Sequence, residues 1–225
     1  MSSDPDRIKI ESRRLSASSR RLWARQSNTF SGSNLPPLGS PSWLAICQLR
    51  DRTISHSPKV DAIAAYNFSY FCFKTRELLL NYFQSAYAGL NRQGVFFLDI
   101  FGGTSAMEES YEERDIDKSV RYDGSKVPAF SYIWEQKRFN VITNEIHCKI
   151  HFGYKDGTAI YDAFDYDWRL WTPPEVCELL IDAGFKQADV YIHGWDEFGE
   201  SDDIFRLRNY YENEVGWIGY IVAVK

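Results

Sequence analysis

The chain has 225 residues, of which 44% are hydrophobic, 16% are aromatic and 25% are charged, and its net charge is −5. This composition is typical of one globular domain with a tail, and the acidic balance argues against nucleic acid or an anionic membrane as a partner. No stretch approaches the roughly 20 apolar residues of a membrane span, and no charged start followed by an apolar run indicates a secretory signal.

Residues 1–42 contain eleven serines, two adjacent prolines and almost no hydrophobic periodicity. Such a segment cannot bury enough apolar surface to offset the entropy lost on ordering, so a disordered tail is expected. Residues 1–40 hold seven basic and three acidic residues, a net charge of +4, which leaves −9 for residues 41–225. Two interpretations of this start stay open: an organelle transit peptide, or a flexible or wrongly assigned beginning.

The globular part is expected to span residues 43–225 and to begin with a short strand at Trp43–Leu49. Val60–Tyr66 is rich in small apolar residues and predicts a strand buried on both faces, as parallel strands are. A helix is predicted over Lys74–Leu90, where apolar residues recur at helical spacing. The nearly all-apolar Val95–Ile100 predicts a second strand, which a right-handed crossover would place parallel to the first.

A different pattern follows, beginning with a long polar loop expected over Thr104–Pro128. Three strands that alternate with period 2 are predicted within an insert of about residues 128–168, at Phe130–Phe139, Asn144–Gly153 and Thr158–Trp168. In the middle strand, four apolar residues starting at Ile146 alternate with four polar residues starting at Glu145, which predicts one packed and one hydrated face. Asp156-Gly157 is a strong hairpin signal, so the insert is predicted to be an antiparallel meander.

Thr172-Pro173-Pro174-Glu175 predicts the start of a second helix, because the threonine can cap it, a proline fits its first turn and the glutamate completes a capping box. Gly184 is the expected left-handed terminator. A strand is predicted over Ala188–His193, and an acidic, aromatic loop with a short helix over Gly194–Glu214. The last strand is predicted over Trp217–Lys225.

Five segments in this order carry a resemblance to a known family: VDAIAAYNFSY, KTRELLLNYFQSAYAGL, GVFFLDIFGG, FDYDWRLWTPPEVCELLIDAGF and GWIGYIVAVK. The series resembles the C-terminal part of class I S-adenosylmethionine-dependent methyltransferases over about residues 51–225. The resemblance implies an α/β fold, namely an incomplete Rossmann-like, doubly wound sheet with an inserted antiparallel β-meander and an antiparallel C-terminal strand. It also implies S-adenosylmethionine as cofactor and methyl transfer to a small-molecule acceptor.

The same resemblance suggests which residues surround the methyl donor. Asn67 and Phe68 would line the cofactor pocket, Tyr70 would lie near the substrate, and Asp51 would contact the adenine amino group. The family's glycine-rich loop and the acidic residue that holds the ribose are not found in this sequence. Because the glycine loop lets the backbone approach the cofactor, its absence would weaken donor binding.

A tyrosine or histidine is the expected proton acceptor, because an O or N nucleophile loses a proton on methylation. Tyr70 and His193 are the candidates, His193 because it ends a predicted strand near the loop region. Asp162, Asp165 and Asp167 could gather a cation or a substrate amine, or form a solvated hairpin face. On a regular strand Asp165 and Asp167 would share a face and Asp162 would oppose them.

The four cysteines are scattered without a C-x-x-C pair or metal-ligand spacing, so no metal site and a reducing, cytoplasmic location are expected. Cys148 and Cys177 are expected in the core as small apolar residues. Two functions stay open: a methyltransferase, and a non-catalytic remnant or interaction module derived from one. Missing strands would leave an open sheet edge, through which the chain could self-associate.

Overall fold

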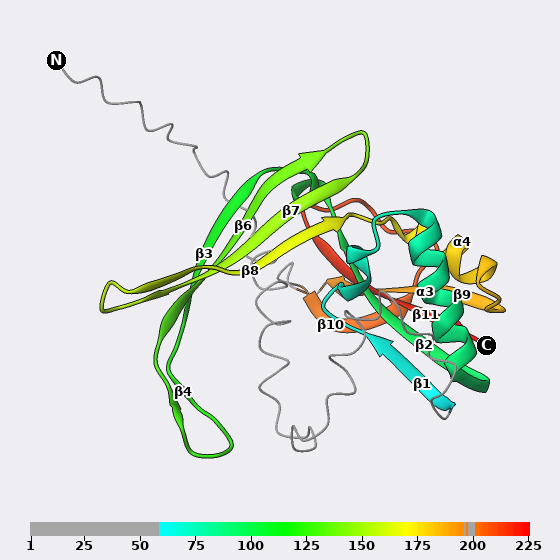
Figure 1. Cartoon of the computed structure of the whole chain (residues 1–225), viewed down its shortest axis with the longest axis horizontal. Coiled ribbons are helices and arrows are strands. Elements are labelled where there is room, and N and C mark those ends of the chain that lie inside the picture. The colour runs from blue at the N-terminus through cyan, green and yellow to red at the C-terminus, as the bar shows by residue number, and fades with distance from the viewer. Residues whose placement is uncertain (1–58, 196, 198–200) are drawn as a thin grey trace.

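The computed structural model describes residues 59–195, 197 and 201–225. Within these ranges the chain forms two β-sheets, a short two-stranded ribbon and two α-helices (Figure 1). The serine-rich segment, the candidate strand Trp43–Leu49 and Asp51 lie outside the described residues, so the expectations for them stay predictions. Neither helix in the described ranges has the length and hydropathy of a membrane span.

The first sheet has five strands in the order β1–β2–β11–β9–β10. They are β1 (Val60–Ala65), β2 (Leu90–Gly102), β9 (Gln187–Trp195), β10 (Ser201–Leu207) and β11 (Trp217–Val224). β1 and β2 run parallel, with Ala62 opposite Val95 and Ala65 opposite Leu98, which confirms the predicted strand–helix–strand unit. The expectation that this first strand is buried on both faces is wrong: most of β1 is exposed, because it lies at the edge of the sheet in the described part of the chain. The other neighbouring pairs are antiparallel, including the C-terminal strand β11 against β2, as expected.

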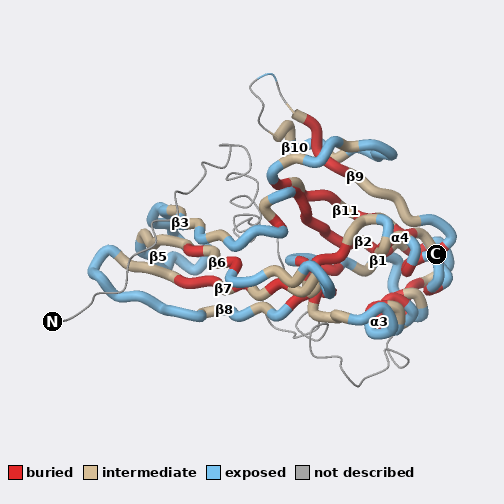
Figure 2. Tube along the Cα trace, turned by 90° about the horizontal axis from the view of Figure 1, so that it is seen from above, coloured by how far each residue is buried: buried red, intermediate tan, exposed pale blue. Residues whose placement is uncertain are grey.

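Two helices, α3 (Arg76–Gly89) and α4 (Pro173–Asp182), pack against each other over one face of this sheet. Their apolar stripes meet the strands through aromatic contacts. The ring of Phe83 in α3 lies 5.9 Å from that of Phe96 in β2, which in turn stacks 6.0 Å from Phe185, just after α4. Figure 2 shows the buried residues concentrated where the helices cover β2 and β11.

The two ends of α4 follow the predicted local signals. The Glu175 carboxylate accepts the Thr172 amide at 2.9 Å and the Thr172 hydroxyl at 2.8 Å, and Pro173 takes the first helical position. Gly184 ends the helix with a φ of 110°. A Cβ at Gly184 would lie only 3.3 Å from the ring of Tyr87 in α3, so this glycine both reverses the chain and lets the two helices approach.

The second sheet is the predicted meander with one further strand, in the order β3–β6–β7–β8. Its strands are β3 (Ser110–Ile116), β6 (Phe130–Asn140), β7 (Glu145–Tyr154) and β8 (Ala159–Arg169). All pairs are antiparallel, and the sheet projects from the first one as a long curved arm (Figure 1). At the base of the arm Ile146 and Cys148 are fully buried, as the alternation in β7 predicts, and join the core of the first sheet.

Two segments expected to be loops contain strands instead. The predicted loop Thr104–Pro128 holds the 3-10 helix η3 (Thr104–Met107), β3, and a ribbon of β4 (Ser119–Val120) with β5 (Lys126–Val127). The described residues of the predicted loop Gly194–Glu214 hold β10 and no helix. Both expectations failed because edge strands are stabilised by backbone pairing to one neighbour and need little apolar periodicity. The strand β3, with the sequence SYEERDI, pairs with β6 along its whole length.

A bulge decides on which side of β8 Asp162 projects. The register between β7 and β8 shifts between Ile150 and Phe152, and Asp162 itself has a φ of 51°. Its carboxylate therefore contacts Lys149, as does that of Asp165. The expectation that Asp162 faces away from Asp165 is wrong, because it assumed an unbroken period-2 strand.

Candidate functional site

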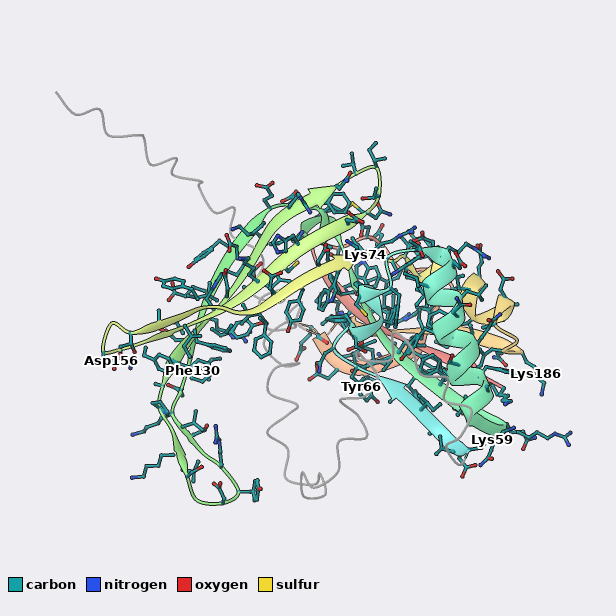
Figure 3. The ribbon with its side chains drawn as sticks, in the orientation of Figure 1. Lys59, Tyr66, Lys74, Phe130, Asp156 and Lys186 are labelled. Atoms are coloured by element: carbon teal, nitrogen blue, oxygen red, sulfur yellow. The ribbon has the colours of Figure 1, made fainter. Side chains whose placement is uncertain are left out.

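Asn67 and Phe68 turn the chain at the carboxyl end of β1, immediately after Tyr66, which Figure 3 labels at the tip of that strand. Both residues have left-handed backbone conformations, with φ of 58° and 53°. The residues that follow, Ser69–Cys72, form the 3-10 helix η2. Left-handed backbone costs a non-glycine residue roughly 1–2 kcal/mol, so two in succession require a compensating interaction.

Asp99 of the neighbouring strand β2 supplies that interaction. Its Oδ2 accepts the Asn67 amide at 2.7 Å, and its Oδ1 accepts the Phe68 amide at 2.9 Å. The side chain is only 2% exposed, and burial raises the pKa of this carboxyl to about 7 although the two amide hydrogen bonds act to lower it. The carboxyl ends of the two parallel strands are thus joined by one buried acidic group.

The two loop side chains occupy different surroundings. Asn67 is exposed, whereas Phe68 is 4% exposed. The ring of Phe68 lies 4.6 Å from that of Phe101 in β2 and 6.5 Å from that of Trp168 in β8. Phe68 therefore anchors the loop to the core and to the meander, and Asn67 is the member of the pair that a ligand can reach. The cofactor roles expected for both residues stay predictions.

The two predicted catalytic residues, Tyr70 and His193, are both fully buried. Burial raises the pKa of Tyr70 well above its ordinary value, and its hydroxyl has no hydrogen-bond partner among the described residues. His193 Nδ1 lies 3.0 Å from the Gly194 carbonyl oxygen, which can only accept, so Nδ1 donates this hydrogen bond. The other ring nitrogen, Nε2, has no partner in the described ranges, and the rings of Trp195 and Tyr211 flank the imidazole. Their catalytic roles stay predictions.

Sequence reasoning missed two residues of this site, Asp99 and Tyr220. Tyr220 of β11 stands opposite Asp99 in the sheet register. The pKa of its hydroxyl is raised, first by burial and then by the negative charge of Asp99. A signal was present in the strand VFFLDI, where Asp99 is the one charged residue. A carboxylate in a buried strand needs hydrogen-bond donors, because burying an unpaired charge is costly. Such a residue therefore indicates a contact with donors from another segment of the chain.

The described glycines near this edge serve packing. A Cβ at Gly102 would collide with the indole of Trp217, the first residue of β11. Gly103 has a φ of 118°, and a Cβ there would lie 2.5 Å from the carbonyl oxygen of Val215. These two positions let the chain before β11 cross closely over the end of β2. No glycine-rich turn follows a strand in the manner of a donor-binding loop within the described residues.

Ion pairs cover the polar face of the meander. Asp162 and Asp165 both contact Lys149, and Asp167 contacts Lys74 at 2.8 Å. The three aspartates considered for a cation or a substrate amine are thus each paired with a lysine. In the part of the chain that the structure describes, no group of three or more histidine, cysteine, aspartate or glutamate side chains is arranged to hold a metal ion.

No family model matches this sequence, and no curated protein matches it. Solved structures do match. DesVI from Streptomyces venezuelae has a TM-score of 0.50 and 14% identity, over 75% of this chain and 60% of DesVI. An S-adenosylmethionine-dependent methyltransferase from Clostridium acetobutylicum has a TM-score of 0.48 and 17% identity, over 92% of this chain and 72% of that protein. CalS10 from Micromonospora echinaspora, an amino pentose methyltransferase, has a TM-score of 0.48 and 13% identity, over 75% of this chain and 59% of CalS10.

The chain therefore shares its fold with DesVI, and at 14% identity the likeness concerns the fold alone. The α/β class expected from the sequence agrees with the two sheets and two helices of the described residues. This chain spans about three fifths of the length of DesVI and of CalS10.

Proposed function

We propose that this chain takes part in methyl transfer from S-adenosylmethionine to a small-molecule acceptor. The observation that carries the proposal is the loop after β1, where Asn67 is exposed at the carboxyl ends of two parallel strands and Asp99 holds its backbone. In open α/β sheets ligands bind at this edge. The donor's sulfonium methyl group is already electrophilic, so the protein mainly aligns donor and acceptor and excludes water.

The described residues supply one side of a donor site. The Asn67 side chain can both donate and accept hydrogen bonds, which suits a polar contact to the donor. A glycine-rich loop and a ribose-binding carboxylate are not found in the described ranges. Because a hydrogen bond to a charged group contributes about 1.5–3 kcal/mol, the loss of such contacts predicts weak donor binding. A Rossmann-like, doubly wound sheet is part of the same proposal, with β1 as an inner strand of the complete sheet.

Titration calorimetry of the full chain with S-adenosylhomocysteine tests donor binding, after circular dichroism has established that the protein is folded. We expect a saturable signal with a Kd below about 1 mM, which corresponds to roughly −4 kcal/mol. Asn67→Ala should weaken binding at least threefold, whereas the control Asn81→Ala, at an exposed position of α3, should leave it unchanged. Silence at millimolar ligand from folded protein would refute the proposal.

A second candidate function is an interaction module that pairs with another copy of itself through β1. Among the described residues β1 has a strand neighbour on one side only, and Val60, Ala62 and Ala64 are exposed. An edge strand with unpaired backbone groups and apolar side chains is a template for pairing with another chain. Such pairing would join the β1 strands of two copies into one continuous sheet.

Size-exclusion chromatography with light scattering tests the second candidate. We expect a dimer whose fraction rises with concentration and which Ala64→Lys disrupts, because a lysine on the edge opposes strand pairing. Ala88→Lys, at an exposed position on α3, is the matched control and should leave the dimer intact. A monomer at every concentration that binds the methyl donor would exclude this function.

The compartment, the remaining partners and the domain division also belong to the proposal. The described cysteines Cys148 and Cys177 are free thiols and the sequence holds no C-x-x-C pair, which favours a reducing, cytoplasmic setting. The net charge of −5 disfavours nucleic acid as a partner. The division into a segment of residues 1–42 and a domain of residues 43–225 is part of the same proposal, and residues 1–58 lie outside the described residues.

A further inference from the structure

The turn at Asn67 and Phe68 depends on a group from another strand. Both residues are left-handed without being glycine, and both direct their amides at the same carboxyl group, that of Asp99. Local sequence alone does not favour two such residues in succession. The contacts bridge 31 and 32 residues of chain, so the turn is set by the packing of β2 beside β1 rather than by its own sequence.

No described lysine, arginine or histidine forms an ion pair with Asp99. Two tyrosines interact electrostatically with Asp99: burial first, and then the negative charge of Asp99, raises the pKa of Tyr70 in η2 and of Tyr220 in β11. Tyr220 stands opposite Asp99 in the sheet register, and Tyr66 at the end of β1 adds a further contribution to the pKa of Tyr220. The two loop amides are thus the main donors that stabilise an ionised Asp99.

We propose that Asp99 is the positioning residue of this loop: its ionised carboxylate holds the Asn67–Phe68 turn and thereby places the Asn67 side chain for the methyl donor. The hydrogen bonds from the turn to Asp99 are present in the structure, and the placing of Asn67 for the donor rests on the proposed function. Asp99 acts through the loop backbone and does not itself contact the donor. Its two oxygens are both committed to the amides.

Protonation of Asp99 changes the turn. An ionised carboxylate accepts hydrogen bonds through both oxygens. In the protonated form one oxygen carries a hydrogen of its own, and that hydrogen meets the hydrogen of the amide that the oxygen accepted before. One of the two amide bonds is then lost or rearranged. Because burial brings the pKa of this carboxyl to about 7, the change falls near neutral pH.

Nuclear magnetic resonance of the isotopically labelled full chain tests the turn directly. The amide signals of Asn67 and Phe68 and the carboxyl carbon of Asp99 are followed from pH 5.5 to 8.5. We expect the three signals to share one midpoint near pH 7. Below the midpoint, protection of the two amides against hydrogen exchange should fall at least fivefold.

Substitutions test whether Asp99 causes the pH dependence of the two amide signals. Asp99→Asn should abolish the midpoint at both amides, and Asp115→Asn, on the exposed strand β3, should preserve it. Should Asp99→Asn fail to fold, Asp99→Glu keeps an ionisable acceptor, and the two amides should then titrate with a displaced midpoint. Amides that do not titrate in the natural chain, or that keep the natural midpoint in Asp99→Asn, would overturn the inference.

Calorimetry distinguishes the role of Asp99 in the turn from its effect on donor binding. In the natural chain S-adenosylhomocysteine should bind at least threefold more tightly at pH 8 than at pH 6, and in Asp99→Asn the ratio should approach one. Equal affinity at both pH values, with titrating amides, would refute the positioning role. Titrating amides without binding heat at either pH would refute the proposed function and leave the role of Asp99 in the turn in place.

Discussion

Replacing Asp99 with asparagine should flatten the pH dependence of stability. The pKa of Asp99 is about 7 in the folded chain against an ordinary value of 3.8, so the folded state binds a proton more tightly than the unfolded state. The free energy of unfolding therefore falls as pH rises between these two values. Each pKa unit corresponds to about 1.4 kcal/mol, so Asp99 accounts for about 4 kcal/mol in all, of which about 3 kcal/mol is lost between pH 5 and pH 8.

Urea unfolding of the natural chain and of Asp99→Asn at pH 5, 6, 7 and 8, at constant ionic strength, measures this difference. Carboxylates with a lowered pKa, such as the half-buried Asp202 at about 2, lose their contribution only under more acidic conditions and do not interfere. Asp115→Asn serves as the control and should keep the natural slope. If Asp99→Asn retained the natural slope from pH 5 to pH 8, Asp99 would not titrate there and the account of its burial would be wrong.

Three further substitutions test the packing around the site. Gly103→Ala should destabilise the fold by roughly 2–3 kcal/mol, because the φ of Gly103 is 118° and the new Cβ would lie 2.5 Å from a carbonyl oxygen. The control Gly124→Ala, where φ is 80° and no atom lies within 4 Å of the new Cβ, should cost about 1 kcal/mol. Thermal unfolding compares the two variants, and equal losses would contradict the close approach at Gly103. Phe83→Ala, which removes a fully buried ring, should cost about 3–5 kcal/mol in urea unfolding, and a loss below 1 kcal/mol would mean that α3 is not packed on β2. Glu175→Ala removes the acceptor of two bonds at the start of α4 and should cost about 1–2 kcal/mol by the same assay; an unchanged midpoint would show that this cap does not form.

The described part of the candidate site was predictable only in part. The loop itself was found because a polar N-F-S-Y sequence follows a strand of small apolar residues, and the end of a parallel strand is where ligands bind. Its anchor, Asp99, was not found, since 31 residues separate it from Phe68 and nothing in the periodicity of VFFLDI says which backbone donors it meets. The burial of Tyr70 and His193 was equally invisible, because a residue at the end of a strand is open or enclosed according to the segments that later pack over it.

Local chemistry determined most of the regular elements. Apolar spacing predicted α3, the capping residues and Gly184 predicted α4, and alternation with Asp156-Gly157 predicted the β7–β8 hairpin, since these signals act between neighbours in the chain. The tertiary structure alone decided three things: that β3 and β10 are strands, that the bulge turns Asp162 toward Lys149, and that Asp99 holds the loop after β1. Each of these depends on a backbone or side-chain partner that lies far away in sequence, and residue order does not specify which partner that is.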